Sequence, residues 1–177
     1  MINDPGKYIY LAAYHSPIGL LYIGTENLST VCWCSPIPPE REYQLIDRFN
    51  SPLLFMMCRY LDEYFAGVRQ YFYDIPLQAQ GTSFQKRIWE TLTKVQYGTT
   101  ISYAELARLA GSPRAIRAVA NAVARNDLLI IYPCHRVIRS DGSIGQYRLG
   151  TAVKTYLLDL EKKKSTFPTH LDQPSVL

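Results

Sequence analysis

The stretch ISYAELARLAGSPRAIRAVANAVARN, residues 101–126, decides the fold of the second half of the chain. Ser102 followed three residues later by Glu105 is a capping-box pattern, which predicts the start of a helix. Gly111 suits the left-handed conformation that often follows the last turn of a helix. The rest of the stretch has helical periodicity, so we expect two helices joined by a tight glycine-containing turn, which is a helix-turn-helix.

The second of these helices is expected to begin with Ser112 as the N-cap and Pro113 as the first helical residue. One predicted face is apolar and consists of Ile116, Val119, Ala120 and Val123. The other carries Arg114, Arg117, Asn121 and Arg125, with Ala115, Ala118 and Ala122 between the two faces. Arginines among small side chains suit a helix that lies against DNA, but the solvated face of an ordinary amphipathic helix explains the pattern equally well.

A third helix is predicted before this pair. Thr82 with Gln85 forms another capping box, and helical spacing continues through Phe84, Ile88, Leu92 and Val95. We expect this helix to end before Gly98.

The first half of the chain predicts a small sheet with one helix. Turn signals separate YIYLAAY (8–14), LLYIG (20–24) and TVCWC (30–34), a pattern that predicts an antiparallel meander. SPLLFMMCRYLDEYFAG (51–67) has a Ser-Pro start, helical spacing and a closing glycine, and predicts a helix. QYFYDIPL (70–77) predicts another strand. The expected fold class is therefore α+β.

Composition and charge change near QAQGTS (78–83), where we expect a linker. Residues 1–80 hold five Lys or Arg against eight Asp or Glu, whereas residues 81–164 hold fourteen against six. The predicted organisation is an N-terminal α/β domain over 1–80, an active-site and helix-turn-helix domain over 81–164, and a tail over 165–177. The basic second domain is expected to face a polyanion such as nucleic acid.

The sequence as a whole argues against several classes of protein. Its 177 residues, 47% of them hydrophobic, can bury a core, and no stretch approaches the roughly 18 consecutive apolar residues of a membrane span. We expect a cytoplasmic protein with reduced thiols, because Cys32, Cys34, Cys58 and Cys134 fit no dense disulfide framework. No metal site is expected, since the histidines that could complete one, His15, His135 and His170, are scattered.

Cys134 stands between a proline and a histidine, after the apolar run LLII (128–131). Most buried cysteines are inert, and the other three cysteines fit that description. Cys134 differs because His135 is adjacent, Asn126 ends the preceding helix, and three arginines follow nearby, Arg136, Arg139 and Arg148. We expect this environment to favour a thiolate, which is the nucleophilic form of the side chain.

The last helix carries a glutamate at the border of its expected buried face. Its expected buried face consists of Val153, Tyr156, Leu157 and Leu160, and Glu161 borders that face four residues after Leu157. A carboxylate near a helix C-terminus opposes the helix dipole, which indicates a separate use, although a solvated glutamate among lysines also explains it.

These motifs occur in a familiar order. PCHRV (133–137), with RN (125–126) and ISYAELARLAG (101–111) before it and GSIGQY (142–147) after it, resembles the O6-alkylguanine-DNA alkyltransferase family, also called methylated-DNA–protein-cysteine methyltransferases. The resemblance covers residues 81–163, and the first 80 residues are similar only in general layout. It implies a ribonuclease H-like N-terminal domain followed by a mainly helical, winged-helix-like DNA-binding domain.

The resemblance also implies a function. It implies DNA repair by a monomer that needs no cofactor and acts on double-stranded DNA containing O6-alkylguanine, with O4 of thymine left open as a second target. The matching cysteine, Cys134, would take the alkyl group irreversibly, once per molecule, while His135 removes its proton through a water. Glu161 would orient that histidine, Asn126 would shape the active-site turn, and Tyr103 would donate to N3 of the flipped guanine.

The resemblance further assigns DNA-binding and pocket residues. Arg117 would fill the space that the extruded nucleotide leaves. The implied DNA-binding set is Tyr103, Arg114, Arg117, Ala118 and Ser140. The implied base pocket is Val123, Val137, Ile144, Tyr147 and Arg148. SDGS (140–143) is a turn signal that we expect to shape SIGQYRLG (143–150) into a lid over this pocket.

The sequence departs from the family at two places. NDLLIIYP (126–133) lacks prolines that are common there, and Leu149 stands where glycine or tryptophan is more familiar. Leu149 leaves open the range of alkyl groups that the pocket accepts.

Three other classes of protein compete with this interpretation. A helix-turn-helix regulator would bind DNA without chemistry. A lesion-recognition protein lacks the reactive cysteine, so the presence of Cys134 argues against that class. A cysteine hydrolase needs a base that reaches the thiol, and no nucleophile-elbow glycines surround Cys134.

Overall fold

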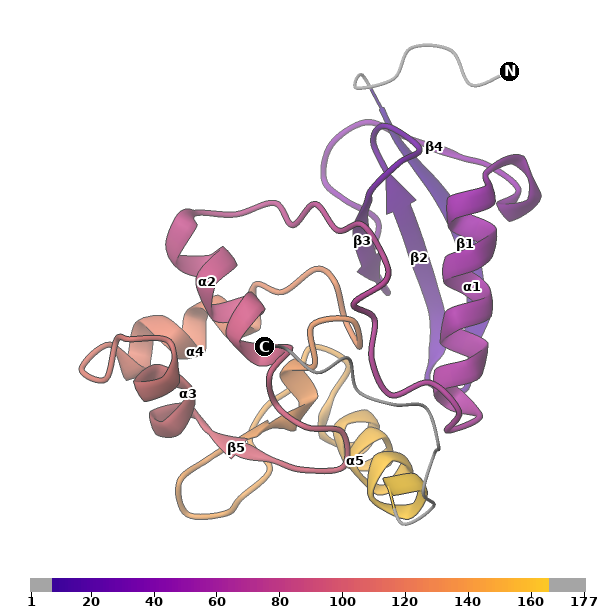
Figure 1. Cartoon of the computed structure of the whole chain (residues 1–177). Coiled ribbons are helices and arrows are strands. Elements are labelled where there is room, and N and C mark those ends of the chain that lie inside the picture. Colours follow the sequence, from indigo (N-terminus) through magenta and orange to yellow (C-terminus); the bar gives the residue numbers. More distant parts are fainter. Residues whose placement is uncertain (1–7, 166–177) are drawn as a thin grey trace, which may run out of the picture.

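The computed structural model describes residues 8–165. Figure 1 shows a small sheet with helix α1 (Pro52–Phe65) along one face and, beside it, the remaining helices, which are α2 (Ser83–Leu92), α3 (Tyr103–Leu109), α4 (Ile116–Ala124) and α5 (Thr151–Ser165). The expected α+β class is confirmed. Within residues 8–165, no helix is long and apolar enough to span a membrane.

The sheet is the predicted meander with one addition. β1 (Ile9–Ser16), β2 (Gly19–Thr25) and β3 (Val31–Ser35) pair antiparallel. The added strand, β4 (Tyr43–Leu45), pairs with β1 in parallel and gives the order β3-β2-β1-β4. All three residues of β4 are exposed, so no apolar pattern marked it in the sequence.

Helix α1 follows a 3₁₀ turn, η1 (Arg48–Asn50), and forms where the sequence predicts it. The Ser51 hydroxyl accepts a hydrogen bond from the Leu54 N–H, and Gly67 takes a φ of 76° after the last turn. The apolar face of α1 packs into the main core through Leu53, Leu54, Met57, Cys58, Leu61 and Tyr64.

The strand predicted over residues 70–77 is wrong. This segment forms no strand, and only Leu77 makes an isolated bridge, with Val31. Its buried residues are Phe72 and Ile75, and the Ile75 N–H donates to the Phe72 carbonyl. The two buried residues are three positions apart because the chain turns between them. A strand with one buried face would instead bury every second residue.

Helix α2 has the predicted capping box, with both hydrogen bonds formed between Thr82 and Gln85. It ends at Leu92, well before Gly98. The indole N–H of Trp89 donates to the Ala122 carbonyl at 2.8 Å, which fixes α2 against α4.

The helix-turn-helix consists of α3 and α4 with Gly111 between them at a φ of 68°. Ser102 caps α3 by accepting from the Glu105 N–H, but the Glu105 carboxylate pairs with Arg108 and does not complete the capping box. Helix α4 begins at Ile116, so the predicted start at Pro113 is wrong.

Helix α4 starts later than predicted because of hydrogen bonds made by Ser112. The Ala115 N–H donates to the Ser112 carbonyl, so residues 112–115 form a turn. The Ser112 hydroxyl accepts from Arg87 of α2 and does not act as a helix cap.

Two short strands connect this unit to the PCHRV segment. β5 (Ile101–Ser102), directly before α3, pairs in parallel with β6 (Val137–Ile138), which follows a 3₁₀ turn, η2 (Cys134–Arg136). Helix α5 lies against η2. Its predicted buried face holds at Leu157 and is wrong at Tyr156, which is 42% exposed. Lys154 and Glu161 are buried together with Leu157. Their charged groups tolerate burial because Lys154 donates to the Val137 carbonyl and Glu161 bonds His135.

One cluster of buried side chains contains residues from both halves of the chain. The halves also share backbone hydrogen bonds, because the Cys34 N–H of β3 donates to the Asp127 carbonyl and the Leu129 N–H donates to the Cys34 carbonyl. The domain boundary near 78–83 stays a prediction, and residues 166–177 of the predicted tail lie outside the described residues.

Thr82→Ala should lower the free energy of unfolding by about 1 kcal/mol, because it leaves the Gln85 N–H without its acceptor at the start of α2. Thr82→Ser keeps the hydroxyl and is the matched control. Denaturant unfolding of the two variants measures the effect, and equal midpoints would contradict it.

Candidate active site

Cys134 lines a pocket of about 400 Å³ and is 5% exposed. The pocket walls come from the start of α3, the second half of α4, the turn after α4 and the segment before α5. They are Tyr103, Ala120, Asn121, Val123, Ala124, Asn126, Leu129, Cys134, Gln146, Tyr147 and Arg148. Pockets of this size hold small molecules or a single base.

Asn126 holds the turn that leads to Cys134. Its Nδ2 donates to the Tyr132 carbonyl at 2.8 Å and to the Cys134 Sγ at 3.2 Å, and its Oδ1 accepts from the Leu128 N–H. Inside this turn Ile130 has a φ of 72°, a left-handed conformation that is strained for a β-branched residue. The bonds of Asn126 fasten both ends of the turn and so maintain that strain beside the thiol.

The thiol of the free protein is protonated. Burial raises the pKa of Cys134, although the Asn126 hydrogen bond and the charges of Arg148 and Lys154 act in the opposite direction. The expected thiolate is therefore not the resting form, because desolvation of the sulfur outweighs the neighbouring charges. A base must take the proton during the reaction.

His135 and Glu161 form a buried pair. Nε2 of His135 lies 2.7 Å from Oε1 of Glu161, and both side chains are fully buried. Burial alone would raise the pKa of Glu161, but His135 and Arg136 outweigh it and hold that pKa well below its usual range. Burial lowers the pKa of His135 despite the carboxylate, so its ring is neutral at pH 7.

The surroundings of the pair fix the tautomer of His135. An ionised carboxylate only accepts hydrogen bonds, so Nε2 carries the proton and donates it to Glu161. Nδ1 is then the basic nitrogen of the ring. It is buried and has no hydrogen-bond partner among the described residues.

The sequence missed two residues of this site, Tyr64 and Lys154, and assigned a different role to Arg136. Arg136, expected near the sulfur, donates instead to both oxygens of Glu161 and to the Val95 carbonyl. Tyr64 of α1 donates to Glu161 at 2.7 Å. Lys154 is buried, which lowers its pKa to about 8, and donates to the carbonyls of Val137 and Ile144. The separation of Lys154, Leu157 and Glu161 by three and four residues was the available signal for a mixed buried face.

The segment that the sequence predicts as a lid contributes to the pocket wall. The SDGS turn forms, with Gly142 at a φ of 84° and the Asp141 carboxylate accepting from Ser143. Tyr147 and Arg148 line the pocket as predicted, and so does Val123 of α4.

Two predicted pocket residues do not line it. Val137 is fully buried in β6, and Ile144 lies where its carbonyl reaches Lys154. Arg148 holds the segment 143–150 against the end of α4 and the turn after it. It forms an ion pair with Asp127 and donates to the Ala124 carbonyl.

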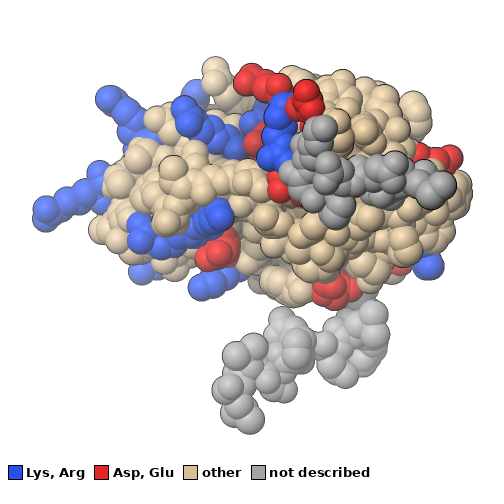
Figure 2. Space-filling model, turned by 90° about the horizontal axis from the view of Figure 1, so that it is seen from above, with Lys and Arg blue, Asp and Glu red and all other residues tan. Residues whose placement is uncertain are grey.

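Most of the residues expected to contact DNA are exposed. Arg114, Arg117, Ala118 and Ser140 are exposed, and Tyr103 is half-buried at the pocket wall. Figure 2 shows Lys and Arg side chains gathered over the end of the molecule that carries α2, α3 and α4. Because α3 and α4 also supply part of the pocket wall, the basic end of the molecule is the one that contains the Cys134 pocket.

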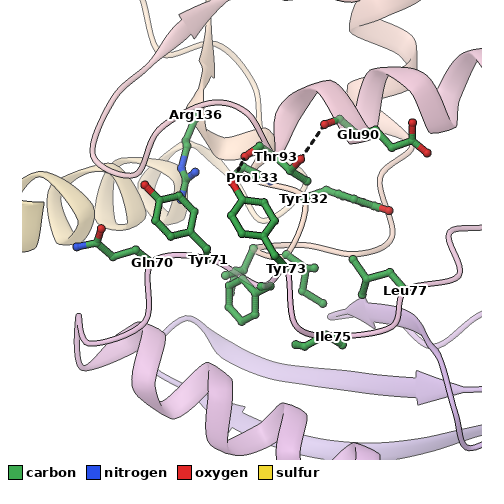
Figure 3. A pocket seen from close by; sticks show the side chains of 13 residues that line it. Gln70, Tyr71, Tyr73, Ile75, Leu77, Glu90, Thr93, Tyr132, Pro133 and Arg136 are labelled. Atoms are coloured by element: carbon green, nitrogen blue, oxygen red, sulfur yellow. Dashed lines mark hydrogen bonds between the residues drawn. The ribbon is translucent and has the colours of Figure 1, made fainter. Parts of the chain in front are cut away.

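A second pocket, of about 210 Å³, lies behind the turn that precedes Cys134 (Figure 3). Tyr71 and Tyr73 stack at its edge, and the Tyr73 hydroxyl donates to the Thr93 carbonyl. It shares no lining residue with the Cys134 pocket and contains no thiol. Among residues 8–165 no group of three or more His, Cys, Asp or Glu side chains lies close enough to hold a metal ion.

Comparison with known proteins identifies the family. A family model described as the DNA-binding domain of 6-O-methylguanine DNA methyltransferase matches residues 83–163. The chain is 37% identical over 161 residues to the constitutive methylated-DNA–protein-cysteine methyltransferase of Bacillus subtilis, covering 86% of this chain and 95% of that protein. This chain belongs to the methylated-DNA–protein-cysteine methyltransferase family.

Two further relatives extend the match across both halves of the chain. A family member from Methanosarcina acetivorans is 37% identical over 156 residues, which are 86% of this chain and 98% of that one. The crystal structure of Mycobacterium tuberculosis OGT in complex with DNA matches at a TM-score of 0.79 and 34% identity, covering 88% of this chain and 94% of that chain. The resemblance expected from the PCHRV segment is confirmed.

Labelling with iodoacetamide should show the protonated thiol. We expect the alkylation rate of Cys134 to rise with pH to a midpoint above the ordinary thiol pKa of 9.0, because burial disfavours the charge. Asn126→Ala should move the midpoint further up, since it removes the hydrogen bond to Sγ.

Asn121→Ala is the matched control, because Asn121 lines the same pocket without bonding the sulfur. Peptide mass spectrometry after timed labelling measures the rate at Cys134. A wild-type midpoint below 9.0, or no difference between the Asn126 and Asn121 variants, would contradict the assignment.

Proposed function

We propose that this protein repairs DNA by transferring an alkyl group from O6 of guanine to the Sγ of Cys134. The observation that carries the proposal is the combination of one pocket-lining thiol with a neutral histidine next to it, oriented by a buried carboxylate. Membership of the methyltransferase family supports the same reaction.

The proposed step is a direct displacement at the alkyl carbon. The Cys134 proton passes through a water to Nδ1 of His135 as the sulfur attacks. The S–C bond forms, the bond between that carbon and O6 breaks, and its electron pair goes to the guanine. Glu161 stabilises the imidazolium, and Tyr103 donates to N3 of guanine, where negative charge develops.

The reaction explains why a thiol is used once. A thioether has no acceptable leaving group under cellular conditions, so nothing restores Cys134 after transfer. Each molecule repairs one lesion, and the chemistry calls on no cofactor. A regulator that only binds DNA would need neither the thiol nor the His135–Glu161 pair.

Access to the pocket requires the base outside the duplex, because O6 is closed to a side chain inside a stacked pair. Two exposed arginines support DNA as the partner, Arg114 in the turn before α4 and Arg117 in its first turn, since neither forms an ion pair with the described residues. We assign Arg114, Ala118 and Ser140 to backbone contacts and Arg117 to the gap that the base leaves. The relative from M. tuberculosis was solved in complex with DNA.

Intact-mass spectrometry after incubation with an O6-methylguanine oligonucleotide tests the reaction. We expect one methyl group to replace the thiol proton of Cys134, a net mass gain of CH2, and Cys134→Ala to gain nothing. Cys58→Ala, which changes another buried thiol, should still gain one methyl group. A gain in Cys134→Ala, or none in the wild type, would exclude the proposal.

Arg117→Ala should slow transfer from double-stranded DNA by about tenfold or more, because no side chain then fills the space that the extruded base leaves in the duplex. Transfer from the free base should change little, since α4 then has no duplex to enter. Arg59→Ala, an arginine of α1 paired with Glu63, is the control. Single-turnover rates measure both, and an equal loss on the two substrates would argue against this role.

A further inference from the structure

Tyr64 is a residue of the first half of the chain whose hydroxyl reaches the His135–Glu161 pair. It is fully buried at the C-terminal end of α1 and donates to Oε1 of Glu161 at 2.7 Å. The same hydroxyl oxygen lies 3.4 Å from Nε2 of His135. Because its single proton goes to Glu161, this oxygen can only accept from the histidine.

We infer that Tyr64 is a positioning residue for this pair and sets the pH at which His135 can accept the proton of Cys134. The inference rests on the proposed alkyl transfer. Tyr64 does not line the pocket of Cys134, and its shorter hydrogen bond is the one to Glu161, at 2.7 Å against 3.4 Å to His135, so it acts mainly through Glu161.

Both carboxylate oxygens of Glu161 accept hydrogen bonds. Oε1 accepts from Tyr64, His135 and Arg136, and Oε2 accepts from Arg136 and the Gly98 N–H. Each donor takes up part of the negative charge that otherwise stabilises the imidazolium. Tyr64 therefore orients Oε1 toward Nε2 and also limits how strongly the carboxylate favours a protonated ring.

The groups around His135 come from several elements. The titratable and charged ones are Tyr64 of α1, Tyr97 before β5, Cys134 and Arg136 of η2, Tyr147 of the lid, and Lys154 and Glu161 of α5. Tyr64→Phe removes one hydroxyl and leaves the other groups in place. The carboxylate of Glu161 then keeps more of its negative charge for the imidazolium, which raises the pKa of His135. Loss of the phenol oxygen as an acceptor for Nε2 acts in the opposite direction, but that contact is longer, at 3.4 Å against 2.7 Å, so the pKa rises.

The test is the pH dependence of single-turnover methyl transfer to Cys134 from a methylated duplex. The rate increases with pH as His135 loses its proton, so the lower limb of the profile reports the coupled titration of this site. Tyr64→Phe should move that limb up by about 0.5 to 1 pH unit. A role confined to packing would lower the rate at every pH and leave the limb in place.

Tyr97→Phe is a matched control. Tyr97 packs edge-on against Tyr64 with ring centroids 6.1 Å apart, and its buried hydroxyl bonds none of the described residues. This variant removes a buried phenol oxygen without touching Glu161, so its limb should coincide with that of the wild type.

NMR titration of the His135 ring, without DNA, gives the second readout. It is taken from the resonances of the folded state, because unfolding would expose the ring and raise its pKa by itself. A higher His135 pKa in Tyr64→Phe than in Tyr97→Phe supports the inference, and equal values overturn it. Absence of methyl transfer in the wild type would instead overturn the proposed function, so the two failures are distinguishable.

Discussion

The buried carboxylate of Glu161 is the interaction on which the arrangement of the site depends. It accepts five hydrogen bonds, from donors in α1, the loop before β5 and η2, and it is completely shielded from water. A buried charge is tolerated only when paired and fully hydrogen-bonded, and Arg136 supplies the opposite charge. Three separate segments are therefore held in one geometry, because each contributes a donor that the others cannot replace.

A second set of contacts positions the thiol within this frame. Asn126 fixes both ends of the turn before Cys134, Arg148 ties the lid to Asp127, and Lys154 ties β6 to the lid through the carbonyls of Val137 and Ile144. The thiol itself stays protonated and nearly buried. Such a site keeps the nucleophile unreactive in the free protein and makes its activation depend on the neighbouring base.

The sequence predicted the parts of the molecule that local signals determine. The capping box at Thr82, the glycine after α3 and the helix at 52–65 all formed because their hydrogen bonds lie within a few residues. The PCHRV segment led to the family. The strand predicted at 70–77 failed because its three consecutive aromatic residues, which have strand preference, run into a turn that Arg69 stabilises from outside the segment by donating to the Tyr71 carbonyl and the Asp74 carboxylate. Nothing in the sequence marked Tyr64 as a site residue, since its position fits the apolar face of an ordinary amphipathic helix.

The pairing of β3 with residues 127–129 bears on how such a protein can diverge. Two backbone hydrogen bonds of Cys34 join the edge of the first sheet to the turn before the nucleophile. Backbone groups are the same in every residue except proline, so this junction constrains the register of the strand and not the identity of its residues. A hybrid that took its first half from a relative would therefore keep the junction if the edge strand had the same register, and would keep the bonds of Glu161 only if it also supplied a tyrosine at the place of Tyr64.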